Sequence, residues 1–112
     1  MTDHAPWRPV CALADILPMS GVAALIDGTQ IALVRWSGDR VHALANQDPF
    51  SGAMVLSRGL VGDCAGAAFI ASPLHKQRFR LEDGVCLEDP AVRLPTWPTR
   101  VVDGQVEVRF TG

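Results

Sequence analysis

The clearest pattern along the chain is a short apolar or alternating run, then Asp-Gly, then a second such run. The pattern occurs three times, with the dipeptides at 27–28, 83–84 and 103–104. Asp-Gly readily adopts the positive φ angles of a type I′ turn, whose twist matches that of the two strands it joins. Three such turns predict an all-β fold, an antiparallel sandwich or barrel built of hairpins.

The runs that flank these turns are the predicted strands: residues 22–26 and 30–36, 78–82 and 85–87, and 100–102 and 105–110. A fourth turn, at 37–40, is expected to join the run at 30–36 to a further strand at 41–45.

Alternation within the runs indicates which side chains are buried. In the last run, Val106, Val108 and Phe110 share one face and the residues between them are polar, which is typical of a half-buried strand near a sheet edge. The run at 31–36 is largely apolar on both faces. We therefore expect it at the centre of a sheet or under a covering loop.

The segment that begins at Lys76 combines two different faces. Phe79 and Leu81 share one face of the predicted strand, and Lys76, Arg78 and Arg80 share the other. Three cations on one face indicate either a solvated surface or a docking patch for an acidic partner.

Residues 48–66 differ from the rest of the chain because Gly, Ser and Pro interrupt them. Their one short apolar stretch, 53–56, follows Ser51, which is a suitable helix cap. We expect one long loop that holds at most one turn of helix, and such a loop in a small β domain is usually functional or packed against something else. Prolines at 90, 95 and 98 predict an extended C-terminal third.

Composition narrows the possible functions. The length of 112 residues and the 48% hydrophobic content predict a single compact domain over residues 1–112, with residues 1–6 as a flexible N-terminus. No apolar run approaches the roughly 20 residues that span a bilayer, and no leader is recognisable at the start, so we expect a cytoplasmic protein. A net charge of −2 without a basic run argues against nucleic acid as a partner.

Three cysteines, Cys11, Cys64 and Cys86, are too few and too scattered for a disulfide framework. No two of them stand in a C-x-x-C spacing, which argues against a zinc knuckle or a thioredoxin-like site. We expect all three to be reduced thiols that are buried or half-buried.

Two loops follow predicted strands in a suggestive order. A Rieske domain holds its [2Fe–2S] cluster with Cys-x-His in one loop and Cys-x-x-His in a second. The later loop here resembles the Cys-Pro-x-His pattern, with Ser72 in the cysteine place and His75 in the histidine place. The earlier loop resembles the Asn-x-Cys-x-His pattern, with Asp48 and Phe50 in the two ligand places.

This departure bears directly on the chemistry. Carboxylate and hydroxyl oxygens are poor substitutes for thiolates, and Phe50 supplies no ligand. Cys64 lies between the two loops and Cys86 follows a predicted turn, so neither stands at a ligand position. We therefore expect no iron–sulfur cluster and no metal site, and we interpret His75 as a hydrogen-bonded structural residue.

Longer strings extend the resemblance over roughly residues 7–110. Asp-Pro-Phe-Ser at 48–51 and Leu-Ser-Arg-Gly at 56–59 are similar to the small subunits of assimilatory NAD(P)H-dependent nitrite reductases. The resemblance implies a Rieske-like fold without its metal, in a non-catalytic subunit with no cofactor of its own. It also implies a large-subunit partner that carries FAD, a [4Fe–4S] cluster and sirohaem and reduces nitrite to ammonium.

The same resemblance brings the two loops together at one tip, which is then free to contact the partner. Phe50 would be an apolar anchor, Arg58 a charged contact and Asp48 an acceptor that fixes the loop. The expected partner interface comprises Phe50, Arg58, His75, Lys76 and Arg78. The alternative interpretation keeps Phe50 in the core and Asp48 as an ordinary Asx-turn residue.

Three other functions have weaker support in the sequence. Ser72 and His75 suggest a hydrolytic site, but no G-x-S-x-G elbow is present, and no glycine-rich phosphate loop exists. A Rieske ferredoxin that carries electrons would need the missing ligands. A metal-free interaction module of another redox complex has the same architecture, and only the longer strings argue against it.

Overall fold

The structure is a computed structural model that describes residues 5–111. The described chain is all-β, as predicted, and its two helical segments are single 3-10 turns. In order, the elements are β1 (Trp7–Ala12), η1 (Leu13–Asp15), β2 (Ser20–Ile26), β3 (Thr29–Arg35), β4 (Val41–Ala45), η2 (Leu56–Arg58), β5 (Leu60–Cys64), β6 (Ala67–Ala71), β7 (Arg78–Arg80), β8 (Thr96–Trp97), β9 (Thr99–Val102) and β10 (Gln105–Arg109). No helix in the described range could cross a membrane.

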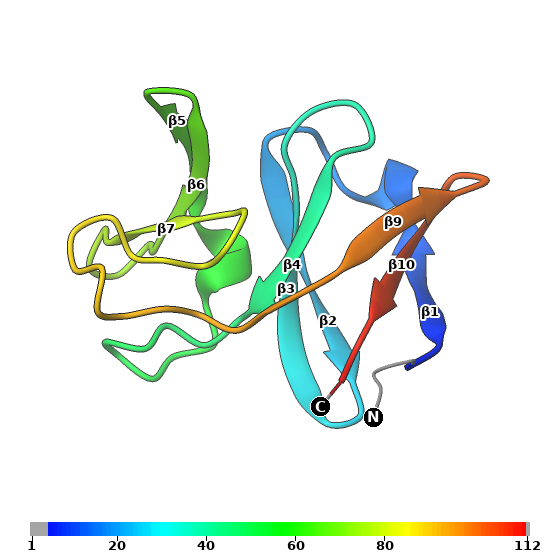
Figure 1. Cartoon of the computed structure of the whole chain (residues 1–112), viewed down its shortest axis with the longest axis horizontal. Coiled ribbons are helices and arrows are strands. Elements are labelled where there is room, and N and C mark those ends of the chain that lie inside the picture. Colours follow the sequence, from blue (N-terminus) through cyan, green and yellow to red (C-terminus); the bar gives the residue numbers. More distant parts are fainter. Residues whose placement is uncertain (1–4, 112) are drawn as a thin grey trace.

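These strands form three antiparallel sheets. The orders are β1-β10-β9, β2-β3-β4-β8 and β5-β6-β7. Figure 1 shows the four-stranded sheet between the other two, with β1, β9 and β10 on one side and β5, β6 and β7 on the other. We call the first two sheets the base and the third the small sheet.

Strand β3 is buried on both faces, which confirms the prediction from its apolar run. Ile31 and Leu33 face the core inside the base, whereas Ala32 and Val34 face a second core beneath the small sheet. All four side chains are 0% exposed. The middle sheet thus separates two apolar cores, and both need β3.

Two Asp-Gly hairpins form as predicted. Asp27 and Gly28 have φ of 49° and 81°, and Asp103 and Gly104 have φ of 50° and 77°. They join β2 to β3 and β9 to β10. The predicted turn at 37–40 likewise joins β3 to β4, closed by a 2.9 Å hydrogen bond from Arg40 N–H to the Ser37 carbonyl.

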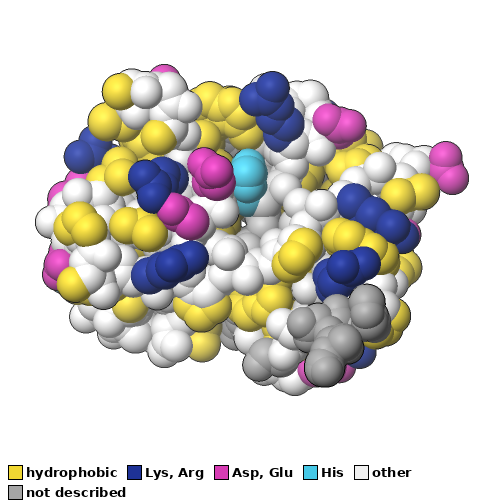
Figure 2. Space-filling model, in the orientation of Figure 1, with side chains coloured by type: hydrophobic (Ala, Val, Ile, Leu, Met, Phe, Trp, Pro, Cys, Tyr) yellow, Lys and Arg dark blue, Asp and Glu magenta, His cyan; other side chains and the backbone are white. Residues whose placement is uncertain are grey.

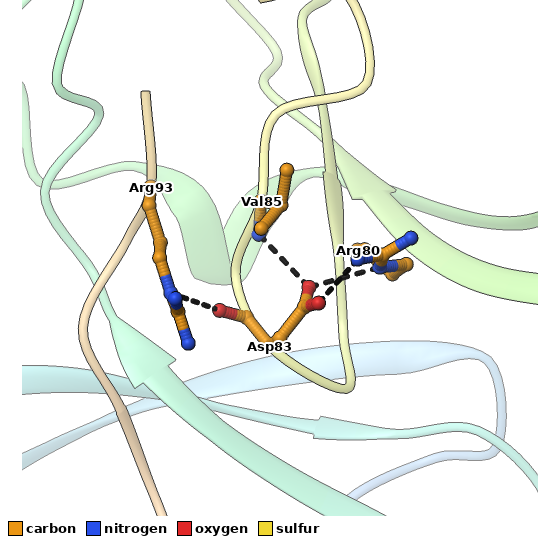
Figure 3. A network of polar contacts seen from close by, with 4 residues as sticks. All are labelled: Arg80, Asp83, Val85 and Arg93. Atoms are coloured by element: carbon orange, nitrogen blue, oxygen red, sulfur yellow. Dashed lines mark hydrogen bonds and ion pairs between the residues drawn. The ribbon is translucent and has the colours of Figure 1, made fainter. Parts of the chain in front are cut away.

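The third Asp-Gly hairpin forms, but its turn differs from the predicted type: Phe79 pairs antiparallel with Cys86, and Arg80 N–H donates to the Val85 carbonyl at 2.9 Å. Only Gly84 has a positive φ there, and Val85 and Cys86 make isolated bridges instead of a strand. The Asp83 carboxylate accepts bonds from the Arg80 guanidinium and from Val85 N–H, while Arg93 Nε donates to the Asp83 carbonyl at 3.1 Å (Figure 3). These side-chain contacts fix a wider loop. A Cβ on Gly84 would also collide with the Leu94 carbonyl oxygen.

The last strand lies at the centre of its sheet, so the predicted edge position was wrong. Val106, Val108 and Phe110 are buried as expected. However, β10 pairs with β9 on one side and with β1 on the other. The alternation of apolar and polar residues in β10 does not indicate its pairing with β1, which is distant in the sequence.

The predicted row of three cations was also wrong. Lys76 has a φ of 66° and lies in the loop before β7, so only Arg78 and Arg80 share the strand face. Both are paired, Arg78 with Glu88 and Arg80 with Asp83.

The segment 48–66 holds one helical turn, but at η2 rather than at 53–56. Ser51 Oγ does not cap it and instead accepts a 3.2 Å bond from Ala53 N–H within the loop. The loop is shorter than predicted because β5 occupies its end. Cys64, at the end of β5, is exposed, which corrects the expectation of a covered thiol, whereas Cys11 is half-buried and Cys86 buried as expected.

Candidate functional site

Two loops meet at one end of the molecule, beside the small sheet. The first tip loop, residues 46–55, joins β4 to η2, and the second tip loop, residues 72–77, joins β6 to β7. Gly59, just after η2, lies so close to the Ala71 carbonyl that a side chain there would collide with it. This close approach brings the end of the first tip loop against β6, immediately before the second.

The first tip loop closes on itself through Asp48. The Asp48 N–H donates to the Ala53 carbonyl at 2.8 Å, and the Gly52 N–H donates to the Asp48 carbonyl at 2.7 Å. The Asp48 carboxylate adds an Asx turn, because its Oδ1 accepts the Phe50 N–H at 2.8 Å. Asp48 therefore fixes its own loop, as both interpretations of the sequence had it.

The second tip loop closes in the same way around Ser72. The Ser72 N–H donates to the Gln77 carbonyl at 2.8 Å, and the Lys76 N–H donates to the Ser72 carbonyl at 3.0 Å. The Ser72 hydroxyl oxygen also accepts the Leu74 N–H at 3.3 Å. Asp48 and Ser72 thus occupy equivalent positions in two loops of similar construction.

A direct hydrogen bond joins these two residues. Ser72 Oγ donates to Asp48 Oδ2 at 2.6 Å, across 24 residues of sequence. Both side chains are 0% exposed. Burial by itself raises the pKa of the Asp48 carboxyl, but hydrogen bonds from Ser72, Phe50 and Ser51 outweigh burial and leave the pKa below its usual range. Asp48 is therefore a buried carboxylate at neutral pH.

The residues present do not fit an iron–sulfur cluster. The two oxygens at the former cysteine places satisfy each other, and Phe50 offers no ligand atom. Cys64 pairs with Ala67 at the turn end of the β5–β6 hairpin, away from Ser72. No group of three His, Cys, Asp or Glu side chains suited to a metal occurs in the described part of the chain.

The remaining two ligand places lie at the surface. Phe50 is 40% exposed, and its ring lies against the buried Phe79 with centroids 6.3 Å apart, so it is not a core residue. His75 is exposed in the second tip loop. No hydrogen bond of its ring is found within residues 5–111, so the structure gives no support to its interpretation as a hydrogen-bonded structural residue.

The other residues of the expected interface differ in their surroundings. Arg58 and Lys76 are exposed and make no ion pair in the described chain. Arg78 is only half-exposed because it bonds Glu88 at 2.6 Å and lies over the Phe69 ring. Four of the five residues thus face solvent, and Arg78 is occupied within the small sheet.

Apart from Phe50, sequence reasoning missed the exposed apolar residues around this tip. Four of the eight large hydrophobic side chains exposed in the described chain belong to it: Phe50, Met54, Leu60 and Leu74. Met54 bridges to Gln47, and Leu60 pairs with Ala71, next to Ser72. Two features of the sequence could have indicated these residues: Leu74 is next to His75, and Leu60 follows Arg58 by two positions.

A cleft lies elsewhere, between the base and the small sheet, where this face of the molecule is hollowed (Figure 2). It has a volume of about 500 Å³ and is lined in part by His42, Glu82 and Trp97. Burial lowers the pKa of His42, so its imidazole is neutral at physiological pH. The lining residues include no Ser or Cys nucleophile. The cleft therefore gives no support to the hydrolytic alternative.

Comparison with known proteins identifies the family of this fold. Residues 6–109 match the family model described as a Rieske-like [2Fe-2S] domain. The nitrite reductase (NADH) small subunit of Salmonella typhimurium is 48% identical over 104 residues, which cover 92% of this chain and 96% of that relative.

Two further comparisons extend this result. A crystal structure from Mycobacterium tuberculosis, assigned as an NADH-dependent nitrite reductase small subunit, superimposes with a TM-score of 0.92 at 46% identity and covers 98% of this chain and 99% of that one. The nitrite reductase [NAD(P)H] large subunit of Klebsiella oxytoca is 45% identical over 103 residues, which are 92% of this chain but 11% of that relative.

Proposed function

The chain belongs to the Rieske-like small subunits of NADH-dependent nitrite reductase, an oxidoreductase, and we propose that it acts there by binding the large subunit, without a cluster of its own. The observation that carries this proposal is the buried bond between Ser72 and Asp48 at two of the four ligand places. A chain that cannot hold the cluster contributes contacts rather than electron transfer. The FAD, [4Fe–4S] and sirohaem centres that reduce nitrite to ammonium then belong to the large subunit, in the cytoplasm.

The Klebsiella relative supports the choice of partner. A segment similar to this chain forms part of a polypeptide described there as a large subunit. Covalent attachment holds two domains at a high effective concentration, which is useful when the domains work in contact. In a separate small subunit, such as the Salmonella typhimurium relative, a non-covalent interface would take the place of that covalent link.

We place this interface at the tip. Exposed Phe50, Met54, Leu60 and Leu74 supply apolar area around the two loops. The exposed cations Arg58 and Lys76 add positive charge, which fits an acidic rim on the large subunit. An apolar centre with a charged periphery is the usual anatomy of a protein interface.

The test starts with the isolated chain. We expect less than about 0.1 equivalent of iron and no visible absorption band, because three ligand places lack a suitable donor. Two equivalents of iron with a visible band would overturn the cluster-free assignment and favour the ferredoxin-type electron carrier.

The second part of the test addresses the partner. The tagged chain is expected to capture the sirohaem-containing large subunit from an extract of nitrate-grown cells. If the large subunit does not bind, and reduces nitrite equally well when the chain is omitted, the proposed subunit role is wrong.

A further inference from the structure

We propose that the Asp48–Ser72 hydrogen bond cross-links the two tip loops, as a bound cluster does in a Rieske domain. The bond thereby positions the apolar residues that dock on the partner. A bound cluster cross-links two loops because each loop supplies two of its ligands. Here the same two backbone positions are joined directly, by a 2.6 Å bond between side chains.

The bond is suited to this task because each partner is also attached to its own loop. Asp48 accepts the Phe50 N–H through Oδ1 while it accepts the Ser72 hydroxyl through Oδ2. Ser72 accepts the Leu74 N–H through the same oxygen that donates to Asp48. The chain of bonds therefore runs from Phe50 through the buried pair to Leu74.

Both ends of this chain are exposed apolar residues. Phe50 is 40% exposed and Leu74 is 50% exposed, whereas Asp48 and Ser72 between them are 0% exposed. A buried polar pair thus sets the spacing of two surface side chains that come from segments 24 residues apart. Asp48 and Ser72 are positioning residues in this scheme, and Phe50 and Leu74 make the contact.

The charge of Asp48 and the burial of the pair both strengthen this hydrogen bond. A hydrogen bond to a charged group is worth more than one between neutral groups, and more still where water is excluded. Loss of one partner leaves the other without its bond in a dry site. Each loop keeps its own backbone bonds in that case, so the loops would separate without the domain unfolding.

The test measures amide hydrogen exchange across the link. Ser72→Ala is expected to accelerate exchange of the Phe50 and Gly52 amides, in the other loop, by about tenfold. Asp48→Ala, which removes the acceptor altogether, is expected to have the same effect on the Leu74 and Lys76 amides. Exchange of the amides of β3 is expected to stay unchanged in both variants, which shows that the fold is intact.

A purely local role predicts a different result. If Ser72→Ala changes only the amides of residues 72–77, and Asp48→Ala only those of residues 46–55, the link between the loops is refuted. Ser37→Ala, in the exposed turn between β3 and β4, is the matched control and should leave both loops as they are.

A second measurement connects the link to binding and rests on the proposed function. Ser72→Ala should raise the Kd for the purified large subunit about tenfold, and Ser37→Ala should not change it. Faster amide exchange in the loops together with an unchanged Kd would overturn the positioning role. If the unmodified chain fails to bind at all, the proposed function is wrong, while the exchange result still decides whether the bond links the loops.

Discussion

The base and the tip of this molecule are held together by different interactions. In the base, two sheets enclose a core of aliphatic side chains, among them Ile31, Leu33 and Val106, all 0% exposed. At the tip, the central contact is a polar one between Asp48 and Ser72, and large apolar side chains lie outside instead of inside. Under the proposed function, stability and partner binding depend on separate sets of residues, and each should be open to change without the other.

The contrast has a physical origin. Apolar burial stabilises in proportion to area and does not depend strongly on direction, so it suits a scaffold. Hydrogen bonds depend on direction, so they suit loops that must present side chains in one arrangement. Mutations in the base should therefore mainly affect stability, and mutations at the tip should mainly affect binding.

The largest effect is expected in the base. Leu33→Ala removes a fully buried side chain from β3 and should lower the free energy of unfolding by about 2–5 kcal/mol. Denaturant unfolding followed by circular dichroism measures this loss. Leu25→Ala, on the neighbouring β2, changes a side chain that is 69% exposed and should stay within about 0.5 kcal/mol of the parent. Equal effects of the two changes would contradict the assignment of the core.

An intermediate effect is expected at the tip, on binding rather than on folding. Phe50→Ala combined with Arg58→Glu removes the apolar anchor and reverses one charge, and should raise the Kd for the large subunit at least tenfold, about 1.4 kcal/mol. Surface plasmon resonance measures the Kd, and circular dichroism should show an unchanged β fold.

The matched control for this pair lies in the base. Leu25→Ala with Arg40→Glu makes the same kinds of change at exposed positions of β2 and of the turn between β3 and β4. Its Kd should equal that of the parent. If both double variants bind equally well, the interface lies elsewhere than at the tip.

The smallest effect concerns the loop that follows β7, where Asp83 bonds Arg80 and Val85 (Figure 3). The hydrogen bond from Arg80 holds the pKa of the Asp83 carboxyl below its ordinary value. A carboxyl whose pKa is lower in the folded state stabilises the fold above its unfolded pKa of about 3.9, and that stabilisation is lost as the pH falls through the folded pKa.

Asp83→Asn should therefore lower Tm slightly at pH 7, and the difference from the parent should diminish at pH 2. The shift should be small because both side chains of the pair are partly exposed and are screened by salt. Thermal melts at the two pH values measure it. A larger Tm difference at the acid pH than at pH 7 would reverse the sign and refute the role of this pair.

The amino-acid sequence by itself determined the features that depend on neighbouring residues. The Asp-Gly turns at 27–28 and 103–104 follow from the φ angles those two residues tolerate, and the two-sided burial of β3 follows from its uninterrupted apolar run. The identities of Asp48 and Phe50 were enough to predict that two ligand places lack their donors.

Only the tertiary structure decided what depends on distant segments. The central position of β10 follows from its pairing with β1, and the wide loop at 83–84 follows from contacts with Arg80 and Leu94. The bond between Asp48 and Ser72 joins residues 24 apart, so neither local pattern contains it. Its geometry depends on how β6 and the first tip loop pack together, and packing between remote segments is set by the whole core rather than by the sequence on either side.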